Sequence, residues 1–263
     1  MTGRRLVSFA AWSVLVLLST APTWAAEPTV APQRILGIFG GMGPEATANL
    51  YYEIVRLTPA TKDQQHIPTL IYSLPQVPDR TACIQSGDRS IVPYLEEGVG
   101  RLERAGASFI VIPCNTVHYF YDDIQRAVKI PVLHLIREAA DAVVARHPQC
   151  KTVGLLATNG TINTGLYEKE LRARGLTVLA PNDSLQQDCV MKAVYGIKSG
   201  MEKKVCEDLL FKAGKSLEDR GAQVIVLGCT EIPLAFNPQR SGVPVVNATR
   251  VLAEAAIRAY RAQ

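Results

Sequence analysis

The sequence of 263 residues has little net charge and lacks the motifs of several common enzyme classes. Its 28 Lys and Arg residues and 24 Asp and Glu residues give a formal net charge of +4, which does not indicate nucleic acid as a partner. The chain contains neither a G-x-S-x-G nucleophile elbow nor a Walker phosphate-binding loop. A metal-ligand spacing is also missing among the histidines, which are His66, His118, His134 and His147.

Residues 1–25 have the features of a secretory signal peptide. Two arginines precede the apolar stretch 6–18, and Thr23 and Ala25 occupy the small-residue positions before a cleavage site. The stretch is too short to span a bilayer as a helix. We therefore expect a periplasmic or secreted mature protein without a stable membrane anchor. Cleavage removes the two arginines and lowers the net charge from +4 to +2.

A cysteine occurs twice in the same sequence setting. The segments GASFIVIPCNT (106–116) and GAQVIVLGCTE (221–231) align at an offset of 115 residues. In each copy the cysteine closes an apolar run, and a threonine follows within two positions. The pattern indicates a duplicated helix, strand and loop, with Cys114 and Cys229 at equivalent positions.

Runs of branched apolar residues alternate with amphipathic stretches, which is typical of a parallel α/β sheet covered on both faces. We expect strands at 35–39, 69–73, 109–112, 132–134, 153–157, 177–179, 224–227 and 243–246. We expect helices at 46–57, 91–105, 119–128, 136–146, 164–174, 189–199, 202–220 and 249–261.

A second repeat divides the chain into two halves. The glycine-containing segment 37–43 aligns with 154–160 at an offset of 117 residues, so each half begins with a strand and a glycine loop. We therefore expect two similar Rossmann-like lobes with parallel sheets, related by pseudo-twofold symmetry. The carboxyl ends of their strands would face one cleft, where open α/β sheets bind ligands.

The paired cysteines predict proton exchange at a carbon centre without a cofactor. One thiolate would remove a proton from one face, and the other thiol would deliver a proton to the opposite face. A single cysteine after an apolar strand is more often inert core, but Cys114 and Cys229 both sit in polar loops. The pattern of a helix start follows Cys114, and a helix amino terminus favours a thiolate.

Four further cysteines do not share this setting. Their wide spacing does not indicate a disulfide framework, and they could be free and buried or partly paired. The nearest pair in sequence consists of Cys189 and Cys206, and the other two are Cys83 and Cys150.

Polar residues beside the cysteine and glycine loops are candidates for holding the α-carboxylate and α-amine of an amino acid. Each alone is more typical of a turn or a helix cap, and the binding role depends on their converging from both lobes. These residues are Asn115, Thr116, Thr158, Thr161 and Thr230. Arg80, which we expect in a proline-flanked loop after the second strand, could bind a carboxylate with its planar fork, and Lys198 is a second cationic candidate.

The glycine-rich segment 40–46 follows an expected strand and opens an expected helix. It fits a loose variant of the dinucleotide fingerprint, but no acidic residue ends the second strand near Ser73 to bind a ribose. Pro44 is equally typical of a helix start without a cofactor. The backbone amides of this loop could instead hold a small carboxylate, and we include Met42 among the substrate-binding candidates.

Together these segments resemble the aspartate/glutamate racemase superfamily, and within it the aspartate racemases. The resemblance covers the chain from about residue 34 to the carboxyl end, without the acid-Ser-Gly loop that opens glutamate racemases. The segments that carry it are GGMGPEAT (40–47), DRT (79–81), PCNTVH (113–118), GLLATNGT (154–161), GIKSG (196–200) and GCTE (228–231).

The resemblance implies an amino-acid racemase that uses no pyridoxal phosphate and no metal, often as a homodimer. It implies Cys114 and Cys229 as the acid/base pair, with Arg80 and Lys198 at the side-chain carboxylate of the substrate. It places Asn115, Thr116, Thr161 and Thr230 near the α-carboxylate. It also implies that the last helix returns to the first lobe, so that lobe 1 comprises 34–133 plus 247–263 and lobe 2 comprises 134–246.

Three alternatives remain open from the sequence. A glutamate racemase or a broad-specificity amino-acid racemase would keep the same site with a different substrate preference. A non-catalytic periplasmic amino-acid-binding protein would keep the cleft, although the cysteine pair argues against it. A nicotinamide-dependent oxidoreductase would need the ribose-binding acid that the sequence lacks.

Overall fold

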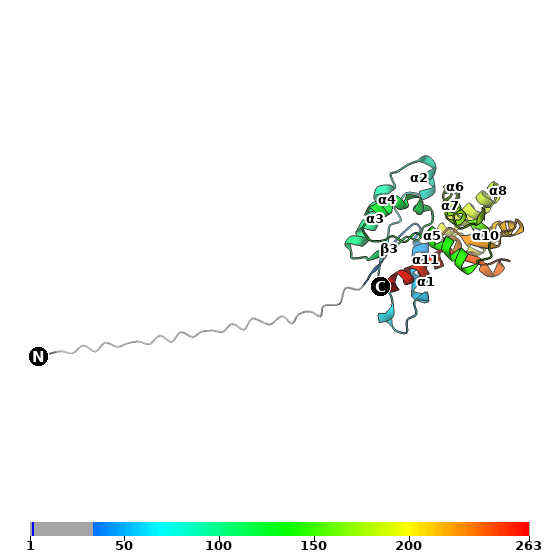
Figure 1. Cartoon of the computed structure of the whole chain (residues 1–263). Coiled ribbons are helices and arrows are strands. Elements are labelled where there is room, and N and C mark those ends of the chain that lie inside the picture. Colours follow the sequence, from blue (N-terminus) through cyan, green and yellow to red (C-terminus); the bar gives the residue numbers. More distant parts are fainter. Residues whose placement is uncertain (1, 3–33, 263) are drawn as a thin grey trace. The chain divides into compact units, whose positions relative to one another are not determined.

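Two separate parallel sheets form the centre of the fold in the computed structural model, which describes residue 2 and residues 34–262 (Figure 1). The first sheet has the order β2-β1-β3, with β1 (Leu36–Gly40), β2 (Thr69–Ser73) and β3 (Phe109–Val111). The second has the order β5-β4-β6-β7, with β4 (Thr152–Leu156), β5 (Thr177–Leu179), β6 (Val224–Leu227) and β7 (Val245–Asn247). The expected α/β class is confirmed. The expected signal peptide lies outside the described residues.

The central strands of both sheets are buried on both faces. In the first sheet Leu36 of β1 lies opposite Thr69 of β2 and Phe109 of β3, and all of β1 is buried. In the second sheet β6, which pairs with β4 and β7, is also buried along its whole length. Strands covered on both faces read as continuous apolar runs, which explains why they were recognisable in the sequence.

The strand expected at 132–134 is not formed as a regular element, so this prediction was wrong. Only Val132 makes an isolated parallel bridge, to Ile110 of β3. The chain cannot extend the pairing because His134 already caps the next helix, with its ring accepting a hydrogen bond from the amide of Arg137. The remaining seven expected strands are present within one or two residues of their predicted bounds.

Helices connect the strands and cover the sheets. The α-helices are α1 (Pro44–Leu57), α2 (Arg80–Ser86), α3 (Val92–Arg104), α4 (Tyr121–Arg126), α5 (Leu135–Arg146), α6 (Asn159–Asn163), α7 (Leu166–Arg172), α8 (Asp183–Leu185), α9 (Lys192–Lys198), α10 (Lys203–Asp219) and α11 (Ala248–Arg261). Short 3₁₀ turns are η1 (Asp63–Gln65), η2 (Thr116–Phe120), η4 (Ile232–Leu234) and η5 (Pro238–Arg240), and η3 (Gln186–Met191) is a π-helix.

Three helical predictions need correction. The helix expected at 164–174 is the shorter α7, and the short helix α6 before it was not predicted. The helix expected at 119–128 begins earlier, as the 3₁₀ turn η2. The helix expected at 189–199 is the end of a longer run that starts with α8 and continues through the π-helix η3 into α9. Helix α2 was not predicted, because its start is set by a cap: the Asp79 side chain accepts a hydrogen bond from the amide of Ala82.

One apolar core joins the two halves of the chain. It contains Leu36 and Ile38 of β1, Val153 and Leu155 of β4, and Leu252 of α11, all buried. Helix α11 packs against both α1 and α5, and Figure 1 shows its carboxyl end beside α1. Two further clusters lie under α3 and α4 in the first half and under α9 and α10 in the second. The predicted lobe bounds and the pseudo-twofold relation stay predictions.

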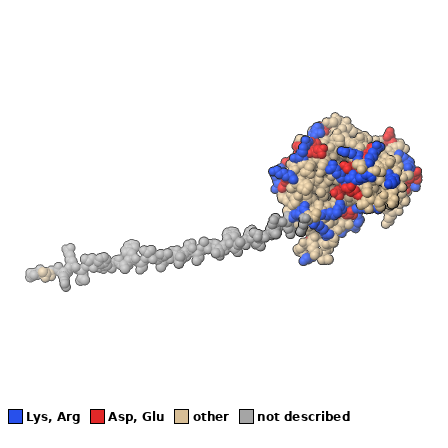
Figure 2. Space-filling model, viewed as in Figure 1, with Lys and Arg blue, Asp and Glu red and all other residues tan. Residues whose placement is uncertain are grey.

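The remaining expectations concern the surface charge, a membrane anchor and the pairing of the cysteines. Figure 2 shows Lys and Arg interspersed with Asp and Glu on the face in view, without a large region of one sign. Among the described residues, no helix is both long and apolar enough to cross a membrane. All six cysteines are free and buried, so the pairing of Cys189 with Cys206 that the sequence left open does not form.

Candidate functional site

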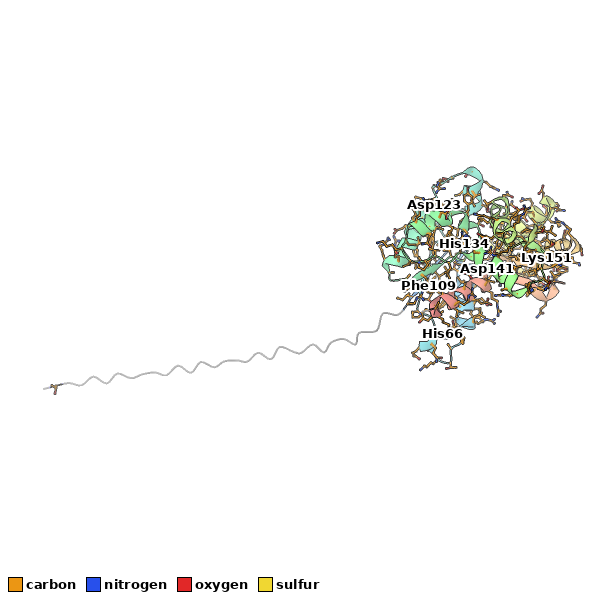
Figure 3. The ribbon with its side chains drawn as sticks, in the orientation of Figure 1. His66, Phe109, Asp123, His134, Asp141 and Lys151 are labelled. Atoms are coloured by element: carbon orange, nitrogen blue, oxygen red, sulfur yellow. The ribbon has the colours of Figure 1, made fainter. Side chains whose placement is uncertain are left out.

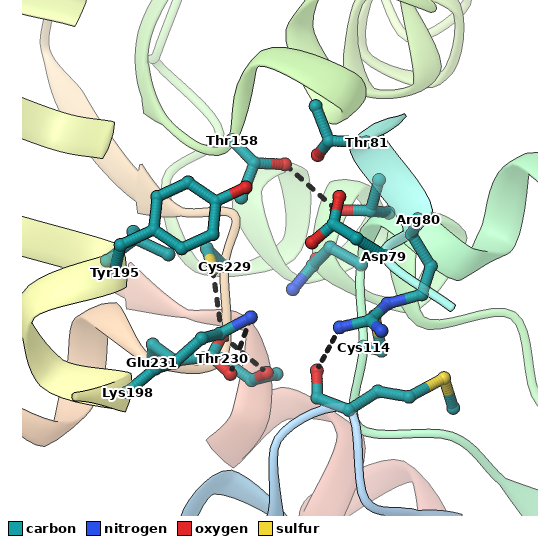
Figure 4. Close-up of a pocket in the computed structure, with 14 residues that line it drawn as sticks. Asp79, Arg80, Thr81, Cys114, Thr158, Tyr195, Lys198, Cys229, Thr230 and Glu231 are labelled. Carbon is teal, nitrogen blue, oxygen red and sulfur yellow. Dashed lines mark hydrogen bonds and ion pairs between the residues drawn. The ribbon is translucent and has the colours of Figure 1, made fainter. Parts of the chain in front are cut away.

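A pocket lies where the cysteine loops of the two halves meet (Figure 4). Its empty volume is about 340 Å³. It is lined by Met42, Asp79, Arg80, Thr81, Cys114, Asn115, Thr116, Thr158, Val194, Tyr195, Lys198, Cys229, Thr230 and Glu231. Nine of the ten residues proposed from the sequence therefore line one pocket. The tenth, Thr161, lies directly behind its wall.

Both cysteines follow the carboxyl ends of parallel strands. Cys114 comes shortly after β3 and Cys229 shortly after β6, and each residue is only 5 % exposed. The two loops are joined directly, because the Thr230 hydroxyl donates a hydrogen bond to the carbonyl oxygen of Pro113 at 3.0 Å. The duplicated sequence thus delivers two thiols to the same pocket from different sheets.

Three threonine hydroxyls hold the first cysteine loop against α6. The Oγ1 atoms of Thr116, Thr158 and Thr161 form a triangle with sides of 2.9, 3.0 and 3.1 Å. Gly160 permits this approach, because a Cβ atom there would lie 2.8 Å from the Thr116 methyl group and from the Thr81 hydroxyl. Of the three hydroxyls, those of Thr116 and Thr158 belong to residues that line the pocket, whereas Thr161 supports them from behind.

His118 fixes the backbone of the first cysteine loop. Its Nδ1–H donates to the carbonyl oxygen of Cys114 at 2.8 Å, and its Nε2 accepts the Leu135 amide at 3.1 Å. Burial lowers the pKa of His118 to about 4, so the ring is neutral near pH 7. His134, labelled in Figure 3, lies beside it with ring centroids 5.1 Å apart. These contacts make His118 a support of the loop backbone, and it does not line the pocket.

Asn115 presents an unused donor to the pocket. Its Oδ1 accepts the Tyr167 hydroxyl at 2.7 Å, which orients the amide group. Its Nδ2 is buried and has no hydrogen-bond partner within the described part of the chain. A buried donor without a partner costs about 1–3 kcal/mol, and a ligand oxygen would supply the missing acceptor. Tyr167 stays a neutral donor, since burial raises its pKa above the usual range.

Cys229 differs from Cys114 because a carboxylate accompanies it. The Cys229 thiol donates to Glu231 Oε2 at 3.0 Å, while Glu231 Oε1 accepts the amide of Gly43 at 3.0 Å. Lys198 Nζ lies 3.6 Å from the same Oε1. Burial, and then the negative charge of Glu231, raise the pKa of Cys229 well above its usual value.

The two predicted cationic residues are held differently from each other. Arg80 is 9 % exposed and opens α2 rather than lying in a loop, which corrects its expected setting. Its guanidinium donates to the carbonyl oxygens of Val77, Pro78 and Met42 at 3.0 to 3.3 Å. Lys198, at the end of α9, is paired with Glu231. Although burial alone would lower its pKa, Glu231 and Cys229 raise it, so Lys198 is charged.

Several lining residues were not singled out from the sequence. Glu231 was visible inside the GCTE segment, and Asp79 inside DRT, but nothing assigned either to a role. Thr81 also lay inside DRT without a role, and neither Tyr195 nor Tyr167 behind Asn115 was part of any quoted motif. Their positions depend on how α2, α7 and α9 pack together rather than on local pattern. No group of three or more His, Cys, Asp and Glu side chains among the described residues is placed to hold a metal ion.

Two parallel sheets, each with a thiol after one of its strands, form an α/β fold with one shared pocket. The model of the Asp/Glu/Hydantoin racemase family matches residues 39–256, and the chain belongs to this family. The protein is therefore an isomerase of the amino-acid racemase class. This assignment disfavours the binding-protein and oxidoreductase alternatives.

The chain is similar to several individual racemases. The chain is 28 % identical over 234 residues to the broad-specificity amino-acid racemase RacX of Bacillus subtilis (strain 168), covering 87 % of this chain and 99 % of that protein. It is 29 % identical over 181 residues to a glutamate racemase of Aquifex aeolicus (strain VF5), covering 66 % and 68 % of the two chains. The solved Picrophilus torridus aspartate racemase superposes with a TM-score of 0.78 at 29 % identity, covering 86 % of this chain and 94 % of that one.

Proposed function

We propose that the protein interconverts the L and D forms of aspartate, or of a similar acidic amino acid, with Cys114 and Cys229 as the two bases and no cofactor. The observation that carries this proposal is that both thiols line one pocket together with the cationic side chains of Arg80 and Lys198. The similarity to the Picrophilus torridus aspartate racemase supports the acidic substrate.

In the proposed reaction, the thiolate of one cysteine removes the Cα proton while the thiol of the other donates a proton to the opposite face. One C–H bond and one S–H bond break, and one of each forms, so the substrate is inverted and the two cysteines exchange protonation states. For the opposite enantiomer the roles reverse.

The weak acidity of the Cα proton is the main barrier to this reaction. Removing it places negative charge on the α-carboxylate, and preorganised donors in a site without bulk water stabilise such charge. The free Nδ2 of Asn115 is the donor that this proposal uses, and the threonine triangle holds its loop in place. Arg80 and Lys198 would meet the side-chain carboxylate of the substrate.

A broad-specificity racemase is the second candidate, and a specific observation favours it. The carboxylates of Asp79 and Glu231 line the same pocket as Arg80 and Lys198, so its formal charges balance before a substrate enters. Such a pocket could accept an amino acid whose side chain is neutral or positively charged. The similarity to the broad-specificity racemase RacX supports this candidate.

Hydrogen exchange would test both candidates in one experiment. The purified protein, with a mild reductant and no added cofactor, is incubated in heavy water with L-aspartate, L-glutamate, L-alanine or L-lysine. Proton NMR follows loss of the Cα signal, and chiral chromatography follows the D form. We expect fastest racemisation of L-aspartate, and a selective loss of acidic substrates in Arg80→Ala. Fastest turnover of L-lysine would overturn the acidic assignment, and no exchange with any amino acid would overturn the racemase proposal.

We also propose that the protein is exported and acts as a homodimer. The signal-peptide features of residues 1–25 support export, and the resemblance to the racemase superfamily supports the dimer. Mass spectrometry of the protein from a periplasmic fraction should give a mature chain that begins at Ala26. Light scattering of the mature protein should give twice the chain mass. Retention of residues 1–25, or a monomer at micromolar concentration, would refute the respective part.

A further inference from the structure

Among the aligned positions at which the two cysteine loops differ, one has an acid in the second copy only. At the offset of 115 residues that superposes Cys114 on Cys229, Thr116 aligns with Glu231. The hydroxyl of Thr116 is used in the threonine triangle with Thr158 and Thr161. The carboxylate of Glu231 instead accepts a hydrogen bond from the Cys229 thiol at 3.0 Å. The duplication thus carries a neutral residue beside one cysteine and an acid beside the other.

Glu231 is held in place from three directions. It is 3 % exposed, and its Oε1 accepts the Gly43 amide at 3.0 Å from the glycine loop that precedes α1. A Cβ atom at Gly43 would lie 3.1 Å from that oxygen, so the loop backbone approaches the carboxylate closely. Lys198 reaches it from α9, and Thr230 Oγ1 lies 3.5 Å from Oε2. A carboxylate fixed in this way cannot turn away from the Cys229 sulfur.

The charges around Cys229 decide which form of the thiol is favoured. Ionising Cys229 would place a second negative charge beside the buried carboxylate of Glu231, and like charges at such a distance oppose ionisation strongly. Lys198 on α9 is the nearest positive charge and acts in the opposite direction. The other ionisable groups around this site are Asp79 and Arg80 at the start of α2, Tyr167 of α7, Tyr195 of α9 and Cys114 after β3.

Lys198 does not offset Glu231 fully, because it lies 3.6 Å from Oε1 rather than beside the Oε2 that accepts the thiol, and its 29 % exposure lets solvent screen its charge. Glu231, by contrast, is in direct hydrogen-bond contact with the sulfur. Tyr167 and Tyr195 are neutral, since burial raises the pKa of each. The net effect of the surroundings is to retain the proton on Cys229.

We propose that Glu231 is a positioning residue that holds Cys229 as the protonated thiol in the free enzyme, which leaves Cys114 as the resting base. This inference rests on the proposed two-cysteine function and assigns its starting state. In the first turnover Cys114 takes the Cα proton and Cys229 gives its proton to the opposite face. The enzyme returns to its resting form when Cys114 releases a proton to solvent and Cys229 takes one up beside Glu231.

Carbon NMR of protein labelled with ¹³C at cysteine Cβ tests this assignment without requiring activity. The Cβ shift follows thiol ionisation and does not depend on reagent access to these buried residues. Signals are assigned from the spectra of Cys114→Ala and Cys229→Ala. We expect the Cys229 signal to titrate at higher pH than the Cys114 signal. A Cys229 signal that titrates at the same pH or lower would overturn the proposal.

Three variants separate the charge of Glu231 from a general structural effect. In Glu231→Gln the Cys229 midpoint should fall by at least about one pH unit, while the Cys114 midpoint stays in place. In Glu231→Asp, which keeps the charge at a longer distance, the shift should be smaller. Glu97→Gln removes an exposed carboxylate of α3 and should change neither midpoint. An unchanged Cys229 midpoint in folded Glu231→Gln would refute the role.

The kinetic readout is the pH profile of kcat/KM. The alkaline limb should report loss of the Cys229 proton, so it should move to lower pH in Glu231→Gln and not in Glu97→Gln. If the wild-type protein racemises no amino acid, the proposed function fails, yet the NMR titration still decides where the proton resides. Should the wild type be active and the limb remain fixed, the positioning role alone is rejected.

Discussion

The two cysteine loops have nearly the same sequence pattern but different surroundings. The Cys114 loop is fixed by neutral groups, the ring of His118 at its backbone and the hydroxyl of Tyr167 at Asn115. The Cys229 loop is fixed by charge, through Glu231 and the nearby Lys198. A duplicated strand and loop therefore sets where each thiol lies. The side chains that differ between the copies set its protonation.

This difference has a consequence for a two-base racemase. Such an enzyme needs one thiolate and one thiol at the start of each turnover, and two identical environments would not choose between them. A carboxylate beside only one cysteine supplies the choice. We therefore expect the thiols of Cys114 and Cys229 to differ in protonation, although the reaction requires both of them.

The largest effect is expected from removing either thiol. Cys114→Ala and Cys229→Ala should each lower kcat/KM by at least about 10³-fold, because each removes a proton-transfer group that the reaction requires. Racemisation rates in both directions, measured by chiral chromatography, would check this. Activity within about tenfold of wild type in either variant would show that the loop concerned does not supply a base.

The second prediction concerns His118, which holds the Cys114 loop, and the stability of the protein in acid. The folded-state pKa of His118 is about 4, below the ordinary 6.5, so the unfolded chain takes up a proton that the folded protein refuses. The stabilisation by the neutral ring is complete above pH 6.5 and is lost as the pH falls toward 4, by about 3 kcal/mol in total. Denaturant unfolding at pH 7.0, 5.5 and 4.5 would measure it.

His118→Asn keeps a donor for the Cys114 carbonyl oxygen but cannot titrate. It should be less stable than wild type at pH 7 and should lose less stability on acidification. His147→Asn, at the carboxyl end of α5, serves as the matched control and should keep the wild-type pH dependence. Equal losses in all three proteins would show that His118 does not carry the effect.

The sequence predicted the position of the loops better than their surroundings. Apolar runs correctly predicted β1, β3, β4 and β6, because strands buried on both faces need continuous apolar side chains. The repeat and the family resemblance then located the cysteines and most lining residues. The features of the site that the sequence did not reveal depend on contacts distant in the chain. The Tyr167 hydroxyl meets Asn115 across 52 residues, and Glu231 meets the Gly43 amide across 188.

The third prediction sharpens the comparison at Asn115. Tyr167→Phe removes the hydroxyl that orients the Asn115 amide and leaves Oδ1 buried without its donor. We expect a rise in KM and a fall in kcat/KM of about tenfold, which corresponds to about 1.4 kcal/mol. The Cβ titration of Cys229 should not move, because Tyr167 is neutral and its hydroxyl donates to Asn115 rather than to the Cys229 loop. Tyr52→Phe, at a tyrosine that is 60 % exposed, should behave as wild type. A larger effect on Cys229 than on substrate binding would contradict this division.

The smallest effect on catalysis is expected from a cysteine outside both loops. Cys206 is fully buried in the core beneath α10, is free, and does not line the pocket. Cys206→Ala should lower the free energy of unfolding by about 1 kcal/mol, because it removes one buried sulfur from a packed core. The rate of racemisation should stay within about twofold of the wild-type rate. The titration midpoints of Cys114 and Cys229 should equal those of the wild type within experimental scatter. If Cys206→Ala instead abolished activity without unfolding the protein, position at the end of a duplicated strand would not be what distinguishes a catalytic thiol in this chain.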